Sequence, residues 1–142
     1  MEKIVIDASI VAKWFIKEHN SDLALEIRDK FVDGRLELIA PELLPFEVLN
    51  ALKYSRLFPI EDLKDAATAL DEYAFLLVSF NGNYAQKAVK VAEKYDITIY
   101  DAAYVGLSSF LNVPAYSADK KLIKRLGSHF SDKIFFLGEL GS

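Results

Sequence analysis

Short apolar stretches alternate along the chain with longer segments of helical periodicity, and this alternation constrains the fold more than any other feature. Brief β-branched and aromatic runs predict buried strands, whereas apolar residues spaced three and four apart predict amphipathic helices. The predicted strands are residues 4–6, 36–40, 75–80, 114–117 and 134–137. The predicted helices are residues 9–17, 21–32, 42–57, 60–73, 84–95, 101–111 and 120–126. This order predicts an α/β fold with a mostly parallel sheet and helices on both faces.

Length and composition predict one domain. The chain has 142 residues, of which 52% are hydrophobic, enough for one substantial core. No linker, low-complexity tract or repeat interrupts it. We therefore assign residues 1–142 to a single domain.

Charge and cysteine content exclude several classes of function. The formal net charge of -4 argues against a broadly basic surface that coats nucleic acid. It does not exclude a nuclease, because a carboxylate-rich metal site is itself negative. The absence of cysteine excludes disulfides, thiolate zinc sites and cysteine nucleophiles. The start of the chain is unlike a secretory signal, and no apolar run approaches the roughly 20 residues that span a bilayer. We expect a cytoplasmic protein that does not enter a membrane.

Three aspartates follow apolar stretches and precede predicted helices. Asp7 comes directly after the first strand, Asp119 follows the strand at 114–117, and Asp101 follows Ile97–Tyr100. Ligands of parallel α/β sheets bind beyond the carboxyl ends of the strands, so we expect these three side chains at one edge. Each one could instead cap a helix, since Asp is a favoured N-cap residue.

Glu47 differs, because it lies inside a predicted helix among apolar neighbours. The helical repeat places it on one face with Leu43, Asn50 and Tyr54, so we expect partial burial. A buried carboxylate is costly unless a cation or hydrogen bonds compensate it. The alternative is a solvent-facing or lysine-paired glutamate.

Four converging carboxylates would hold protons or a hard cation, and Mg²⁺ or Mn²⁺ would suit them. The two histidines, His19 and His129, have no partner at metal-ligand spacing, and we interpret both as surface residues. Trp14 fits packing better than base stacking. Several basic residues could bind phosphate or simply be solvated; they are Lys13, Lys17, Lys53, Arg56, Lys120, Lys121, Lys124 and Arg125.

Four segments resemble the motifs of PIN domains, and most closely those of the VapC toxins. They are Val5-Ile6-Asp7-Ala8-Ser9, residues 40–52 around Glu47, residues 99–107 beginning Ile-Tyr-Asp, and Ser117-Ala118-Asp119-Lys120-Lys121-Leu122. The resemblance implies a three-layer α/β/α fold with a five-stranded sheet. It also implies that the catalytic and metal-binding acids are Asp7, Glu47, Asp101 and Asp119, and that Ser9, Asn50 and Ser117 support them.

The same resemblance implies a Mg²⁺-dependent endoribonuclease, with Mn²⁺ as an alternative ion. As a hypothesis, Asp7 and Asp101 bind the ion most directly, while Asp119 and Glu47 act through water or a second ion. The expected products carry a 5′-phosphate and a 3′-hydroxyl. The resemblance further implies that the protein acts on RNA, forms a homodimer and is silenced by a VapB-like antitoxin.

Other phosphate-handling folds fit less well. A haloacid-dehalogenase-like phosphatase needs a second acid where Ser9 stands, and a receiver domain needs an acidic pair near the first strand. No glycine-rich loop follows that strand, and Gly106-Leu107-Ser108-Ser109-Phe110 lacks the second glycine of a nucleophile elbow. The remaining alternative is a non-catalytic module of the same fold that binds RNA or protein.

Overall fold

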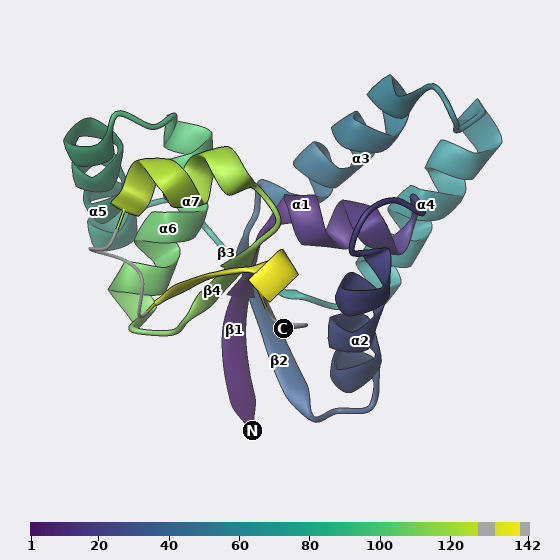
Figure 1. Cartoon of the computed structure of the whole chain (residues 1–142), viewed down its shortest axis with the longest axis horizontal. Helices are drawn as coiled ribbons and strands as arrows, with labels where there is room; N and C mark the ends of the chain where they lie inside the picture. Colours follow the sequence, from purple (N-terminus) through teal and green to yellow (C-terminus); the bar gives the residue numbers. More distant parts are fainter. Residues whose placement is uncertain (128–132, 140–142) are drawn as a thin grey trace.

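The sheet consists of five parallel strands. The computed structural model describes residues 1–127 and 133–139, and the strands lie in the order β3-β2-β1-β4-β5 (Figure 1). Their bounds are β1 (Glu2–Ile6), β2 (Leu36–Pro41), β3 (Leu76–Val78), β4 (Ala115–Ser117) and β5 (Ile134–Phe136). All four pairings are parallel, which confirms the predicted sheet.

Seven α-helices and two short 3₁₀ helices connect the strands within the described residues. The α-helices are α1 (Ala8–Val11), α2 (Ser21–Val32), α3 (Leu44–Ser55), α4 (Ile60–Glu72), α5 (Gly82–Tyr95), α6 (Ile99–Leu111) and α7 (Lys120–Leu126). The 3₁₀ helices are η1 (Ala12–Trp14) and η3 (Leu137–Glu139). No helix in residues 1–127 or 133–139 is long and apolar enough to cross a membrane.

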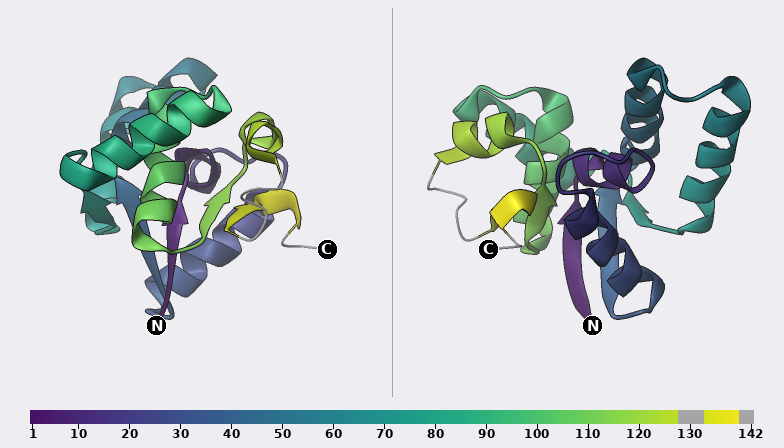
Figure 2. Two further views of the ribbon diagram at one scale, coloured as in Figure 1. Left: turned by 90° about the vertical axis from the view of Figure 1, so that its left-hand side faces the viewer. Right: turned by 45° about the vertical axis from the view of Figure 1, so that its right-hand side comes forward.

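Helices cover both faces of the sheet. α6 packs on β1, β2 and β4, and α5 lies on its outer side. α1 and α2 lie on the other face, while α3 and α4 pair with each other and extend away from the sheet (Figures 1 and 2). The fold is therefore the expected three-layer α/β/α arrangement with a projecting helical pair.

The position of the central strand explains the apolar run Ile4–Ile6. β1 is paired on both edges and covered on both faces, and Ile4, Val5 and Ile6 are fully buried. A strand buried on both faces has no reason to alternate polar and apolar residues. β1 ends at Ile6, and the next residue is the polar Asp7, at the edge where all five parallel strands end.

The first helix is shorter than the predicted 9–17. α1 begins at Ala8 and tightens after Val11 into η1, which ends at Trp14. Trp14 then packs against Tyr73 and Phe75, and its indole N–H donates to the Ala24 carbonyl at 2.9 Å. This packing confirms the structural interpretation of Trp14 and turns the chain away from a longer helix.

α6 begins two residues earlier than predicted. Thr98 is its N-cap, and the Thr98 hydroxyl accepts a hydrogen bond from the Asp101 backbone N–H at 3.0 Å. Asp101 therefore lies in the first turn of α6, and its carboxylate is not the cap. The β-branched run around Thr98 hid this helix start from propensity arguments.

Candidate metal centre

Asp7 lies at the carboxyl end of β1, where the sheet meets α1. Its backbone N–H donates to the Tyr116 carbonyl at 3.1 Å, which ties the end of β1 to β4. Although Asp7 occupies the N-cap position of α1, its side chain makes no capping hydrogen bond. The carboxylate is thus left for other partners.

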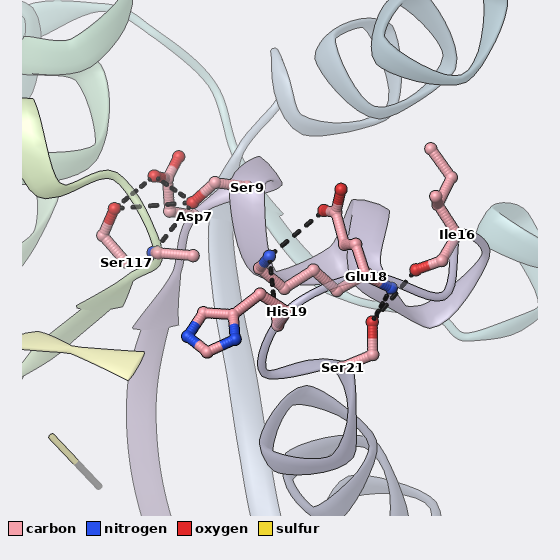
Figure 3. A network of polar contacts seen from close by, with 9 residues as sticks. Asp7, Ser9, Ile16, Glu18, His19, Ser21 and Ser117 are labelled. Atoms are coloured by element: carbon pink, nitrogen blue, oxygen red, sulfur yellow. Dashed lines mark hydrogen bonds and ion pairs between the residues drawn. The ribbon is translucent and has the colours of Figure 1, made fainter. Parts of the chain in front are cut away.

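Two serines hold one oxygen of that carboxylate. Ser117 Oγ donates to Asp7 Oδ2 at 2.6 Å and Ser9 Oγ donates to the same oxygen at 2.8 Å (Figure 3). Ser9 Oγ in turn accepts from the Ala118 backbone N–H at 3.0 Å. These two hydrogen bonds hold the Asp7 side chain in place. Because both end on Oδ2, Oδ1 is left for a further ligand.

Burial raises the pKa of Asp7 above its ordinary value of 3.8. The two serine hydroxyls act to lower that pKa, and the charges of Asp101 and Asp119 act to raise it further. A carboxylate that is buried near two others gains from any cation placed beside it.

Glu47 lies in α3 and is half-buried, as its apolar neighbours in the sequence indicated. Burial raises its pKa above the ordinary 4.5; the nearby Tyr104 hydroxyl acts to lower it, and Asp7 and Asp101 act to raise it. The electrostatic influence of both aspartates shows that Glu47 faces the same region. Glu47 is therefore not a fully solvent-facing glutamate, and no lysine is among the groups that shift its pKa.

The Tyr104 hydroxyl is buried and makes no hydrogen bond within the described part of the chain. It lies close enough to Glu47 to influence its pKa, yet outside hydrogen-bonding geometry. Burial raises the pKa of Tyr104, and the charges of Asp7 and Glu47 raise it further. Tyr104 was not among the predicted site residues, because a tyrosine in an apolar helix usually packs in the core; its polar hydroxyl was the available signal.

Asp101 and Asp119 complete the group from α6 and the start of α7. Burial and then the charge of Asp119 raise the pKa of Asp101, while Thr98 and Arg125 act to lower it. Asp119 caps α7, because its Oδ1 accepts from the backbone N–H groups of Lys121 and Leu122 at 3.0 and 3.2 Å. The capping interpretation thus holds for Asp119 and fails for the side chains of Asp7 and Asp101.

The charge of Asp101 acts on the pKa values of Asp7 and Glu47, and that of Asp119 on the pKa values of Asp7 and Asp101, but the four carboxylates are not gathered at coordination distance. Within residues 1–127 and 133–139, no three His, Asp or Glu side chains lie close enough to hold a metal ion as they stand. Like charges repel one another, which favours separated side-chain positions. Coordination by all four acids therefore stays a prediction.

The remaining predicted site residues divide into two groups. Ser9 and Ser117 both bind Asp7 directly, as described above. Asn50 is exposed and lines a groove between α3 and α4 with Phe46 and Lys53. Its predicted supporting role therefore stays a prediction. His19 is exposed, as expected, and His129 lies outside the described residues.

The fold and this acidic group define an α/β protein with a carboxylate cluster where parallel strands end. That class of arrangement suits phosphate chemistry assisted by a hard cation. The PIN domain model matches residues 4–127, most of the chain, and the chain belongs to the PIN domain family.

Three relatives illustrate the likeness. Ribonuclease VapC3 of Pyrobaculum aerophilum is 29% identical over 128 residues, covering 87% of this chain and 94% of that protein. The structure of VapC20 from Mycobacterium tuberculosis, described as a sarcin-ricin loop cleaving toxin, aligns with a TM-score of 0.67 at 13% identity, over 87% of this chain and 95% of that one. A toxin-antitoxin complex from Klebsiella pneumoniae aligns with a TM-score of 0.59 at 15% identity, over 83% and 88%. These two structural likenesses concern the fold alone.

Proposed function

We propose that this PIN-domain protein is a Mg²⁺-dependent endoribonuclease, with Mn²⁺ able to replace Mg²⁺. One observation carries the proposal: where the parallel strands end, the charges of Asp101 and Asp119 act to raise the pKa of Asp7, and those of Asp7 and Asp101 act to raise the pKa of Glu47. The full-length likeness to Ribonuclease VapC3 supports RNA as the substrate class.

The side chains fit a hard divalent ion. All donors are oxygens, which Mg²⁺ prefers, and burial already disfavours several unneutralised charges. Asp7 would offer Oδ1, because Ser9 and Ser117 occupy Oδ2. Asp119 would offer Oδ2, because Oδ1 caps α7. Asp101 and Glu47 would complete the set from α6 and α3.

A bound divalent ion would lower the pKa of a water molecule and stabilise charge on the phosphodiester. The protein's own contribution is orientation. The serine pair fixes Asp7, the α7 amides fix Asp119, and the Tyr104 hydroxyl lies beside Glu47. Groups held in this way need little rearrangement when substrate arrives.

We further propose that the protein is the toxin of a VapBC-type pair, silenced by a VapB-like antitoxin. The likeness to Ribonuclease VapC3 and to a chain of a toxin-antitoxin complex supports this role. The groove between α3 and α4 offers an apolar surface for such a partner: Phe46 is 74% exposed and Ile60 is 72% exposed. Exposed apolar patches of this kind mark protein-binding sites.

The homodimer and the cytoplasmic location are also parts of this proposal. Exposed Leu76 and Leu77 on the edge strand β3 support self-association, since an apolar sheet edge seeks a partner. Light scattering that finds a monomer, together with no small co-purifying basic protein, would count against both the dimer and the antitoxin.

The second candidate is a non-catalytic module that binds RNA or protein. The separation of the four carboxylates within the described residues favours this alternative. Cleavage of labelled RNA in the presence of Mg²⁺ distinguishes the two functions. We expect cleavage that EDTA abolishes and that leaves 5′-phosphate and 3′-hydroxyl ends. RNA that stays intact with both Mg²⁺ and Mn²⁺, while still binding the protein, would support the alternative.

A further inference from the structure

A large cleft lies beside the acidic group and takes no part in the chemistry described so far. It has a volume of about 660 Å³ and lies between the loop before α2, helix α7 and the β5–η3 segment. His19, Lys120, Lys124, Phe136 and Glu139 are among its lining residues. Small-molecule and cofactor pockets commonly have volumes of about 300–1,000 Å³, so a nucleotide would fit. We call it the Lys120 cleft.

The strand register places this cleft next to the candidate metal centre. Phe136 on β5 is the register partner of Ser117 on β4, and Ser117 Oγ donates to Asp7 Oδ2. Neighbouring strands are about 4.8 Å apart. Lys120 also follows Asp119 directly in the chain. A chain of nucleotides bound at the acids would therefore reach the cleft within a short distance.

The charges of the cleft complement a phosphate backbone. Lys120 and Lys124 are one helical turn apart on α7, so they extend to the same side. Within residues 1–127 and 133–139, neither lysine has an ion-pair partner, whereas Arg125 pairs with Asp96. Two lysines outweigh the single carboxylate of Glu139. An acidic protein that binds RNA needs such a local positive site, because its overall charge of -4 repels phosphate.

Aromatic rings are available in the same cleft. The Lys120 ammonium lies 5.6 Å from the centroid of the Phe136 ring. Gly138 packs against the same ring, since a Cβ there would lie 2.5 Å from Phe136 Cε2. His19 is exposed, and its carbonyl is held by the Lys13 ammonium at 2.8 Å, which fixes the loop (Figure 3). Unpaired RNA bases stack on rings of this kind.

We infer that the Lys120 cleft binds the single-stranded RNA segment adjoining the cleaved phosphodiester. Lys120 and Lys124 bind its phosphates, and His19 and Phe136 present aromatic faces to a base. This inference rests on the proposed function for its substrate class. The inference assigns RNA binding to Lys120 and Lys124 but not to the other basic residues of α7. Lys121 is not among the lining residues, and Arg125 pairs with Asp96.

The test measures binding of a short, mixed-sequence, fluorescent RNA to the full chain carrying Asp7→Asn, which prevents cleavage. Lys120→Gln with Lys124→Gln should weaken binding by roughly tenfold at low salt. It should also reduce the salt slope of the affinity by about 1.4, because each phosphate contact to a single strand contributes about 0.7. Lys121→Gln is the matched control on the same helix and should change affinity less than about twofold.

His19→Ala tests the aromatic part separately. It should weaken binding while leaving the salt slope unchanged, because a stacking contact releases no counterions. An unchanged affinity and salt slope in the Lys120 and Lys124 double variant would overturn the subsite. Wild-type protein that binds RNA with the full slope, yet never cleaves it with Mg²⁺ or Mn²⁺, would overturn the nuclease proposal and leave the subsite supported.

Discussion

At the scale of single residues, Asp119 combines two roles that a substitution can separate. Its Oδ1 caps α7, and its charge contributes to the acidic group. Asparagine caps as well as aspartate but carries no charge, whereas alanine does neither. Asp119→Asn should therefore keep the free energy of unfolding and lose Mg²⁺ affinity. Asp119→Ala should lose about 1 kcal/mol in addition.

Urea unfolding and calorimetric metal titration of both variants check this prediction. Equal metal affinity in Asp119→Asn and wild-type protein would reduce Asp119 to a helix cap.

Tyr104 provides a second residue-scale prediction. Its buried hydroxyl lies beside Glu47 without a hydrogen bond in the described part of the chain, so Tyr104→Phe should leave stability within about 0.5 kcal/mol. If this hydroxyl orients Glu47, the variant should bind Mg²⁺ roughly tenfold more weakly, as for other groups that orient ligands. Thermal unfolding and metal titration together measure both effects.

Tyr84→Phe is the matched control. The Tyr84 hydroxyl, on α5, donates to the Ala103 carbonyl at 2.5 Å. Ala103 lies beside Tyr104 on α6. Removal of the Tyr84 hydroxyl should cost about 1 kcal/mol of stability and leave metal affinity unchanged. If Tyr104→Phe behaves like this control, Tyr104 is a packing residue.

At the scale of elements, α5 and α6 approach so closely that one glycine sets their distance. A Cβ on Gly106 would lie 2.8 Å from Ala88 Cα. Alanine normally stabilises a helix by about 1 kcal/mol relative to glycine, but here it would push the helices apart. Gly106→Ala should therefore destabilise the protein by about 1–3 kcal/mol, as overpacking does. Chemical denaturation measures the sign, and a gain in stability would show that α5 can move.

The sequence predicted elements best where burial dominates. All five strand boundaries were predicted within two residues. The buried part of β1 was the clearest, because a strand covered on both faces requires a continuous apolar run, as in Ile4–Ile6. Helix boundaries that depend on one cap or one packed side chain were not predicted correctly. The Thr98 cap moved the start of α6, and Trp14 packing shortened the first helix.

The candidate site likewise has one part that could be predicted from the sequence and one part that could not. Strand-end aspartates were predictable because a parallel sheet brings strand ends together. The helical phase of α3 was harder, since Glu47 and Asn50 lie on neighbouring but different sides of the helix. Glu47 faces the acids, while Asn50 faces the groove toward α4. A three-residue spacing in one sequence leaves that difference unresolved.

At the scale of the whole molecule, the acidic group couples stability to pH. The pKa values of Asp7, Glu47 and Asp101 are raised in the folded protein, so the folded state binds protons there more tightly than the unfolded chain. Stability without metal should therefore rise as the pH falls from neutral toward about 5. The stabilisation is complete below the unfolded pKa values and is lost as pH rises through the raised ones. Three further groups act on or near these carboxyls, namely Asp119, Tyr104 and Arg125. They are left unsubstituted when stability is compared at different pH values.

Thermal unfolding across this pH range, with EDTA present, measures the effect. Asp101→Asn should flatten the curve, and saturating Mg²⁺ should raise stability near neutral pH by about 2.7 kcal/mol at a hundredfold excess over its Kd. Stability that instead falls steadily on acidification from pH 7 would contradict the raised pKa values.

The central claim is that four carboxylates distant in the sequence share a divalent ion. Isothermal titration of Mg²⁺ into wild-type protein and into Asp7→Asn, Glu47→Gln, Asp101→Asn and Asp119→Asn tests it most directly, with the exposed Glu72→Gln as control. We predict one saturable binding process that each of the four substitutions weakens by roughly tenfold or more, while the control binds as wild type. Wild-type protein that binds no Mg²⁺ or Mn²⁺, or whose affinity survives loss of Glu47 and Asp101, would contradict the claim.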